Sequence, residues 1–183
     1  MHNDVHHERN GRAVNTLPAE NTAARQALEL DGKSAMPYIR GAVVDDAAEI
    51  ARLTQELGYK ASVTEISMRL SMLTEMPGHF VAVAEGRPGT LAGWIAAERR
   101  LILESGQRVE ICGLVVDGTQ RRLGIGRSLI GAVEQWTAQG GLASVVVRTN
   151  IDRPESHSFY LNAGYTRSKT QHVYSKSVPL TSE

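Results

Sequence analysis

Apolar residues recur along this chain at two spacings. Steps of three and four residues predict helices, whereas short apolar runs and alternation predict strands. We expect strands at 38–44, 80–84, 91–103, 109–116, 145–147 and 170–178. Helices are expected to begin at Asp45, Ser62, Ile125 and Pro154. The resulting order, β-α-α-β-β-β-α-β-α-β, predicts an α/β (α+β) domain around a mixed central sheet.

Local capping residues support three of these helices. Ser62 is followed three residues later by Glu65, the pattern of a capping box. Gly58 would end the preceding helix, and Pro154 suits a first helical position. In the helix from Ser62 the residues Met68, Met72 and Met76 form a second stripe, which we expect to be core or contact surface.

The first 36 residues differ from the rest. They are polar and poor in bulky apolar side chains, so residues 19–30 could form at most a marginal helix. We therefore predict a flexible leader, 1–36, before a domain at 37–183. The histidines at its start could bind a metal, but a solvated tail is the better interpretation, because nothing there fixes ligand geometry. These are His2, His6 and His7.

Composition narrows the class of protein. The 183 residues are 42% apolar and 22% charged, which is typical of a folded domain with a core. Twenty basic and twenty acidic residues give a formal charge of zero, which argues against nucleic-acid or membrane-surface binding. A single cysteine excludes an internal disulfide, and the first 30 residues lack a hydrophobic signal core. We expect a cytoplasmic protein that could form a homodimer.

The stretch after residue 109 is the most informative part of the chain. An apolar strand, a turn and the sequence Arg121-Arg122-Leu123-Gly124-Ile125-Gly126 lead into a helix with one apolar face. Glycines at 124 and 126 would let an anion approach backbone N–H groups at the positive end of that helix. Arg121 and Arg122 add positive charge, although they could also be solvated. The pattern predicts a phosphate-binding loop.

The spacing excludes two common phosphate loops. A dinucleotide-binding turn needs a third glycine at position 129, where Leu129 stands. A P-loop needs Lys before its Ser or Thr, but Arg127 precedes Ser128 here.

The spacing R-x-x-G-x-G at Arg121, Gly124 and Gly126, with the strand end Leu114-Val115-Val116 before it, resembles the acyl-CoA pyrophosphate loop of the GNAT superfamily of N-acetyltransferases. The resemblance implies the GNAT fold and acetyl-CoA as co-substrate. It also implies a set of cofactor-binding residues along the strand end, the loop and the next strand's end: Leu114, Val115, Val116, Arg121, Arg122, Leu123, Gly124, Ile125, Gly126, Arg127 and Asn150.

A second segment extends the resemblance. Val145–Val147 and Asn150 are followed by Phe159-Tyr160 and Gly164-Tyr165, which is similar to the GNAT pattern F-Y-x-x-x-G-[FY]. The family usually has Ala where this chain has Ser156. The fuller string N-x-x-R-x-x-S-H-x-F-Y is similar to bacterial small-amine acetyltransferases, including the aminoalkylphosphonate type.

Acetyl transfer to an amine at pH 7 calls for a base and an acid, because the amine is protonated and the leaving thiolate needs a proton. Glu110, 14 residues before Gly124, resembles the general base of some GNAT branches; the alternative is a strand Glu that faces solvent or pairs with Arg108. Tyr160 matches the family's tyrosine at the CoA sulfur; the alternative is a core tyrosine. A backbone N–H near Val116, freed where the strand splays from its neighbour, would bind the oxyanion.

The sequence gives weaker evidence for a functional role of two further residues. His157 could contact substrate or CoA, and a packing role is equally expected. Cys112 has no suitably spaced base, so a buried structural thiol is expected rather than a nucleophile.

The sequence thus predicts a cytoplasmic, acetyl-CoA-dependent N-acetyltransferase that acts on a small-molecule primary amine, aminoglycoside-like or phosphonate-like. The reaction would be direct attack in a ternary complex, with no covalent enzyme intermediate and no metal. Two alternatives remain open: a non-catalytic acyl-CoA-binding or sensor module, and an enzyme that acetylates protein N-termini or lysines.

Overall fold

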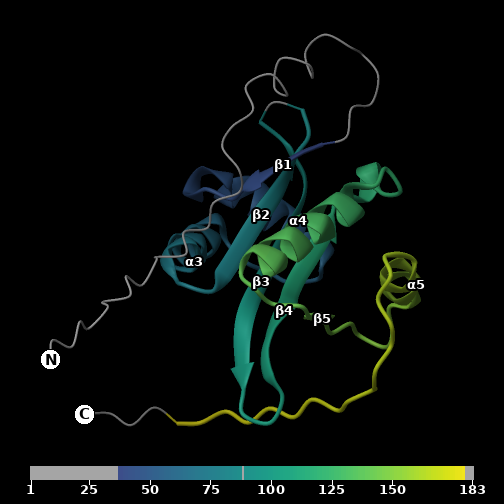
Figure 1. Ribbon diagram of the computed structural model, residues 1–183. Helices are drawn as coiled ribbons and strands as arrows, with labels where there is room; N and C mark the ends of the chain where they lie inside the picture. Colours follow the sequence, from purple (N-terminus) through teal and green to yellow (C-terminus); the bar gives the residue numbers. More distant parts are fainter. Residues whose placement is uncertain (1–36, 88, 180–183) are drawn as a thin grey trace, which may run out of the picture. The chain divides into compact units, whose positions relative to one another are not determined.

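The computed structural model describes residues 37–87 and 89–179 (Figure 1). The predicted leader, with its histidines and marginal helix, lies outside the described residues. The described chain separates into two compact units, one ending at Arg148 and the other beginning at Thr149.

The first unit is built on a five-stranded mixed sheet. Its strands lie in chain order, with antiparallel pairing from β1 to β4 and a parallel pairing of β4 with β5. The strands are β1 Tyr38–Gly41, β2 His79–Glu85, β3 Leu91–Ile102, β4 Gly106–Val116 and β5 Val145–Val147. The predicted strands are therefore confirmed up to β5, with β3 and β4 joined as a long hairpin.

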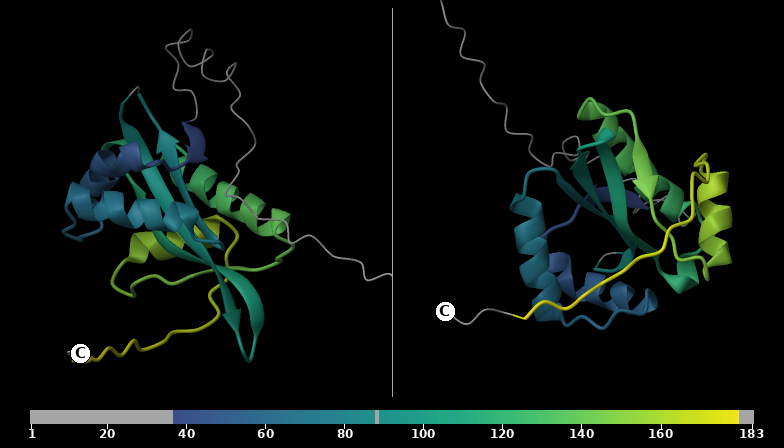
Figure 2. Two further views of the ribbon diagram at one scale, coloured as in Figure 1. Left: turned by 90° about the vertical axis from the view of Figure 1, so that its left-hand side faces the viewer. Right: turned by 90° about the horizontal axis from the view of Figure 1, so that it is seen from below.

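Helices cover both faces of this sheet (Figures 1 and 2). The short 3-10 turn η1, Val44–Asp46, leads into α2, Ala47–Glu56, and α3 spans Val63–Glu75. A second 3-10 turn, η2, Gly118–Gln120, precedes α4, Ile125–Gln139. Helices α2 and α3 lie on one face and α4 lies on the other.

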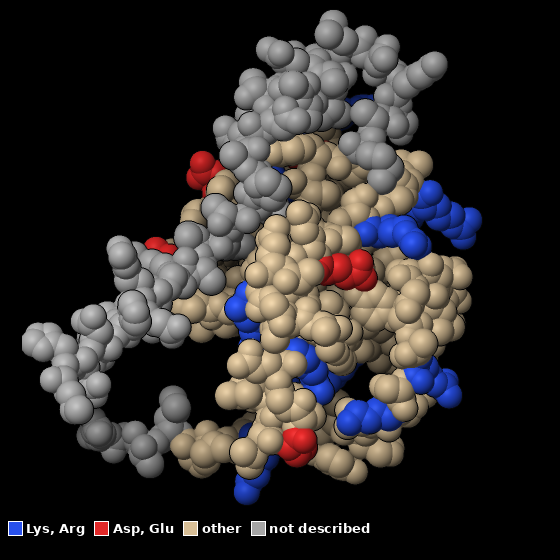
Figure 3. All heavy atoms as spheres, viewed as in Figure 1, with Lys and Arg blue, Asp and Glu red and all other residues tan. Residues whose placement is uncertain are grey.

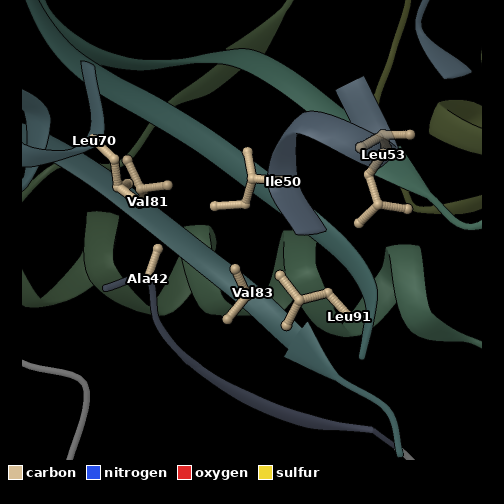
Figure 4. Close-up of a cluster of buried hydrophobic side chains, with 8 residues drawn as sticks. Ala42, Ile50, Leu53, Leu70, Val81, Val83 and Leu91 are labelled. Carbon is tan, nitrogen blue, oxygen red and sulfur yellow. The ribbon is translucent and has the colours of Figure 1, made fainter. Parts of the chain in front are cut away.

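The side chains of β2 point alternately to the two faces of the sheet, and both faces are buried. Val81 and Val83 point into a cluster with Ile50 and Leu53 of α2 and with Leu70 of α3 (Figure 4). Phe80, the residue before Val81, points to the other face and stacks on Trp136 of α4 with ring centroids 5.2 Å apart. Because successive strand residues point to opposite faces, a strand buried on both sides needs a continuous apolar run, as β2 has.

The helix boundaries follow the predicted caps. Ser62 accepts a hydrogen bond at its Oγ from the Glu65 N–H (3.2 Å), and Glu65 Oε2 accepts one from the Ser62 N–H (2.8 Å). The capping box is thus confirmed. The methionine stripe is not part of the core, but its exposed side chains remain compatible with the predicted contact surface: Met68 and Met72 of α3 and Met76 at its C-cap.

The second unit holds one helix, α5, Pro154–Asn162, with Pro154 in its first turn as predicted. The strand predicted at 170–178 is wrong, because residues 165–179 have no regular secondary structure. Val173, Tyr174 and Val178 are exposed there, so the alternation in the sequence lacks the buried face that a strand requires.

Among the described residues, no helix combines the length and apolar character that crossing a membrane demands. On the face seen in Figure 3, the Lys and Arg side chains stand in small separate groups rather than in one continuous field.

Candidate functional site

The predicted phosphate-binding loop joins η2 to α4 and has an unusual backbone. Gly124 is the N-cap of α4 and has φ 82°, in the left-handed region that glycine adopts without a Cβ clash. Arg122, two residues before, has φ 64° and is the one non-glycine residue with positive φ in the part of the chain that the structure describes. Left-handed backbone at a bulky residue is uncommon and is associated with functional loops.

The start of α4 is open to a ligand. Gly124 has no side chain to cap the helix, so the first N–H groups, those of Ile125 and Gly126, have neither an intrahelical acceptor nor a side-chain cap. The Gly124 carbonyl accepts the Ser128 N–H at 3.0 Å, which sets the first turn. Leu123 and Arg127 are exposed beside this turn. These donors at the positive end of a helix fit a pyrophosphate group.

Strand β4 offers a second set of backbone donors. The Asp117 N–H donates to the Ala92 carbonyl of β3 at 2.9 Å. Because N–H groups alternate in direction along a strand, those of Leu114 and Val116 point away from β3. The ladder with β5 ends at the pair Ile111 and Val147, so no strand of the described sheet covers this edge. The edge of β4 near Val116 is therefore unpaired within the described sheet, which the predicted splay requires, and Val115, between these donors, is buried in the core.

A β-bulge interrupts β4 at Cys112. The register passes from the pair Ala97–Ile111 to the pair Ala96–Gly113, which leaves Cys112 without a partner on β3. The thiol is exposed, so the prediction of a buried structural cysteine is wrong. Partial desolvation, and then the nearby Glu98 and Glu110 carboxylates, raise the pKa of Cys112 to about 11. A raised pKa favours the protonated thiol at neutral pH, whereas the thiolate is the nucleophilic form.

Helix α2 braces the loop, a feature that the sequence analysis missed. Arg52 Nη1 donates to Asp117 Oδ2 at 2.9 Å, and Asp117 Oδ1 accepts from the N–H and Oγ1 of Thr119. The Thr119 hydrogen bonds and the Arg52 guanidinium hold the pKa of Asp117 below its usual value.

One turn further along α2, Glu56 Oε2 accepts the Gly118 N–H at 2.9 Å and lies 3.6 Å from Arg121 Nη2. Spacings of 62 and 65 residues carry no local sequence signal, which is why the brace could not be found in advance. Arg121, 60% exposed, stands at the loop as predicted.

Glu110 lies in the middle of β4 and is 7% exposed. Its Oε2 lies 3.0 Å from Arg100 Nη1 and 3.8 Å from Arg108 Nη2, and its Oε1 lies 3.2 Å from Arg148 Nε. Pairing with Arg108 was the structural alternative to a base, and it is one of three ion pairs here. Sequence reasoning did not find Arg100 and Arg148, which neighbouring strands bring to the carboxylate.

The other predicted residues belong to the second unit. Asn150 shapes the turn before α5: its Oδ1 accepts the Asp152 N–H at 3.1 Å, and its carbonyl lies 3.0 Å from His157 Nε2. His157 thus contacts the turn that precedes its own helix. Tyr160 contacts Phe159 and Tyr165 edge-on, at centroid distances of 5.1 and 5.6 Å. Burial raises the pKa of Tyr160 to about 12.

No group of three or more His, Cys, Asp or Glu side chains with metal-binding geometry occurs within residues 37–87 and 89–179.

The model of the family described as Acetyltransferase (GNAT) family matches residues 44–165. No curated protein matches the sequence. Among solved structures, aminoglycoside N-acetyltransferase AAC(6')-Iy in complex with CoA is 18% identical, with a TM-score of 0.72 over 80% of this chain and 99% of that one.

Two other solved structures are similar. An aminoglycoside 6'-N-acetyltransferase from Acinetobacter haemolyticus is 18% identical, with a TM-score of 0.68 over 78% of this chain and 99% of that one. A tetramutant protein from Bacillus halodurans is 21% identical, with a TM-score of 0.65 over 76% and 99%. At these identities the structures show a shared fold.

Proposed function

Because the chain belongs to the GNAT family of acetyltransferases and acetyl-CoA is its co-substrate, we propose that it transfers the acetyl group to a primary amine of a small molecule. The observation that carries this proposal is the loop at α4, where an uncapped helix start follows two residues with positive φ. Solved structures of similar fold act on aminoglycosides, so a small-molecule acceptor is favoured over a protein one.

The donor's pyrophosphate would be held by the N–H groups at the start of α4, with Arg121, Arg122 and Arg127 beside it. The pantetheine arm would pair with the open edge of β4, where the N–H groups of Leu114 and Val116 point outward. Asn150 would contact the same arm. An extended chain with amide groups bonds to such an edge as an added strand does.

The acceptor amine would attack the thioester carbonyl directly, without a covalent enzyme intermediate. In this scheme Glu110 accepts the ammonium proton through a water, because guanidiniums occupy both of its carboxylate oxygens. The Val116 N–H stabilises the oxyanion, and Tyr160 donates its proton to the departing thiolate as the C–S bond breaks.

The test is thiol release from acetyl-CoA with a panel of amines. Release that depends on both substrates, with an acetylated amine found by mass spectrometry, would support the proposal. Donor binding with no release from any amine or peptide would favour the acyl-CoA-binding module instead. Release from peptides in preference to small amines would favour a protein acetyltransferase.

The variant Glu110→Gln tests the base. Its turnover should fall most at low pH, where amine deprotonation limits the rate, and should recover as pH approaches the pKa of the amine. Wild-type turnover at every pH would mean that the carboxylate is structural.

A further inference from the structure

The pairing of β2, β3 and β4 assembles a row of charged side chains on one face of the sheet. His79 is opposite Glu98, and Glu98 is opposite Glu110. Two residues nearer the hairpin turn, Arg100 is opposite Arg108. Side chains two residues apart on a strand share a face, so the arginine pair stands beside the carboxylate pair.

The face in question is the one that α2 and α3 cover. His79 alternates in step with Val81 and Val83, which pack against those two helices. Arg99, between Glu98 and Arg100, points the other way and lies 5.0 Å over the ring of Trp136 in α4. The arginines around Glu110 are therefore separated by the sheet from the α4 side.

Guanidiniums outnumber carboxylates in this cluster. Arg100, Arg108 and Arg148 converge on Glu110, and Arg100 Nε also lies 3.3 Å from Glu98 Oε1. Three positive and two negative groups leave an excess of one positive charge, before any protonation of His79.

Donor groups of this cluster remain open. Within the described residues, Arg148 contacts Glu110 through Nε alone, and its side chain is 54% exposed, which leaves the two Nη groups for a further contact. Arg100 is 41% exposed and engages Nη1 and Nε, which leaves Nη2. The buried Nε of Arg108 has no hydrogen-bond partner. Guanidinium groups presented in this way bind carboxylates and phosphonates through paired hydrogen bonds.

We propose that the acceptor is an amine that carries an oxyanionic group, a carboxylate or phosphonate, and that Arg100, Arg108 and Arg148 bind this group while its amine lies at Glu110. This inference rests on the proposed function, which places the amine at that carboxylate. The close approach of the arginines to Glu110 requires a short chain between amine and anion. An amine with several further ammonium groups would bring like charges together and is disfavoured.

The experiment compares acceptors of similar length and different charge. 3-Aminopropylphosphonate and 4-aminobutyrate carry an anion, 3-aminopropanol is neutral apart from its amine, and 1,4-diaminobutane carries a second ammonium. Thiol release should give a kcat/KM at least roughly 10-fold higher for the anionic amines, mainly through KM, and added salt should narrow the difference.

Variants then test which residues cause the preference for anionic amines. Arg148→Gln should lower the ratio of kcat/KM between 4-aminobutyrate and 3-aminopropanol, whereas a change in Glu110 alone would alter both acceptors alike. Arg100→Lys keeps the charge but loses the planar guanidinium, and should lower the ratio less. Arg69→Gln, a matched loss of one positive charge on the exposed surface of α3, should leave the ratio unchanged.

The outcomes separate this proposal from the one before it. Preference for neutral or dicationic amines would overturn the oxyanion assignment and leave the acetyltransferase proposal standing. An unchanged ratio in Arg148→Gln would also overturn the assignment. Donor binding without thiol release from any amine would overturn the proposed function, and the oxyanion assignment with it.

Discussion

Burial fixes the protonation state of Tyr160, the residue proposed as the acid. Its ring lies against Phe159 and Tyr165, and desolvation raises the pKa of its hydroxyl to about 12. A raised pKa keeps the phenol protonated, so the donor is retained until pH approaches 12. The hydroxyl is therefore protonated over the whole range in which amines are acetylated, but the same raised pKa, above the ~8.5 of a thiol, makes proton transfer to the thiolate less favourable.

Tyr160→Phe keeps the ring and removes the hydroxyl. If Tyr160 is the acid, the turnover rate should fall by roughly 10²-fold or more, with little change in acetyl-CoA affinity. Steady-state kinetics and calorimetry measure the two quantities. Because the hydroxyl stays protonated, the wild-type rate should not fall at alkaline pH below about pH 10 through loss of this proton. The pH profiles of the wild type and the variant should therefore have the same shape in that range. Unchanged turnover in a folded Tyr160→Phe variant would assign the tyrosine to packing.

At the scale of single elements, the proposed function places the donor's pyrophosphate at the start of α4. Gly124→Val places a β-branched residue at φ 82° and covers the N–H groups with a side chain. The strain should cost about 1–2 kcal/mol of stability, while acetyl-CoA binding should be abolished. Circular dichroism checks the fold and calorimetry checks affinity. Unchanged affinity in a folded variant would refute the loop assignment.

The contacts from α2 to the loop before α4 predict that a substitution in α2 weakens acetyl-CoA binding. Arg52→Gln removes the bond to Asp117 and the contacts with Glu49 and Leu91. Because hydrogen bonds to charged groups fix geometry strongly and Arg52 is partly exposed, we expect acetyl-CoA affinity to fall roughly 3- to 10-fold. Arg69→Gln, on the exposed surface of α3, is the control. Equal affinity in both variants would mean that the turn holds its shape without α2.

For the whole molecule, donor binding should appear as stabilisation. Acetyl-CoA at 100 times its Kd should add about 2.7 kcal/mol and raise Tm, because the ligand binds the folded state. NADH and ATP should not do so, since Leu129 stands where a dinucleotide loop needs glycine. Thermal melts with each ligand decide this. A larger shift with NADH would contradict the loop assignment.

The predicted leader gives a second test at this scale. Deletion up to Ala35 should leave folding and acetyl-CoA affinity intact, because residues 1–36 are poor in core-forming side chains. Loss of soluble protein on truncation would instead show that this segment packs against the domain.

The sequence by itself determined the features that depend only on neighbouring residues. The capping box at Ser62, the proline at the start of α5 and the glycine at the start of α4 each depend on residues within one helical turn. The apolar face of α4 and the apolar run of β2 follow from the spacing of apolar residues alone, because side chains that share a face are buried together. Strand boundaries shifted by a few residues, since the partner strand decides where a ladder ends.

Only the tertiary structure decided the surroundings of the candidate site. Three arginines reach Glu110 from β3, from β4 and from the end of β5, because the pairing register, not sequence spacing, places them together. The bulge that exposes Cys112 and the brace from Arg52 to Asp117 arise in the same way. Contacts between distant segments depend on how strands and helices pack, and a local pattern carries no record of them. The sequence therefore determined the loop proposed to bind the donor, whereas packing determined the charges around the proposed acceptor site.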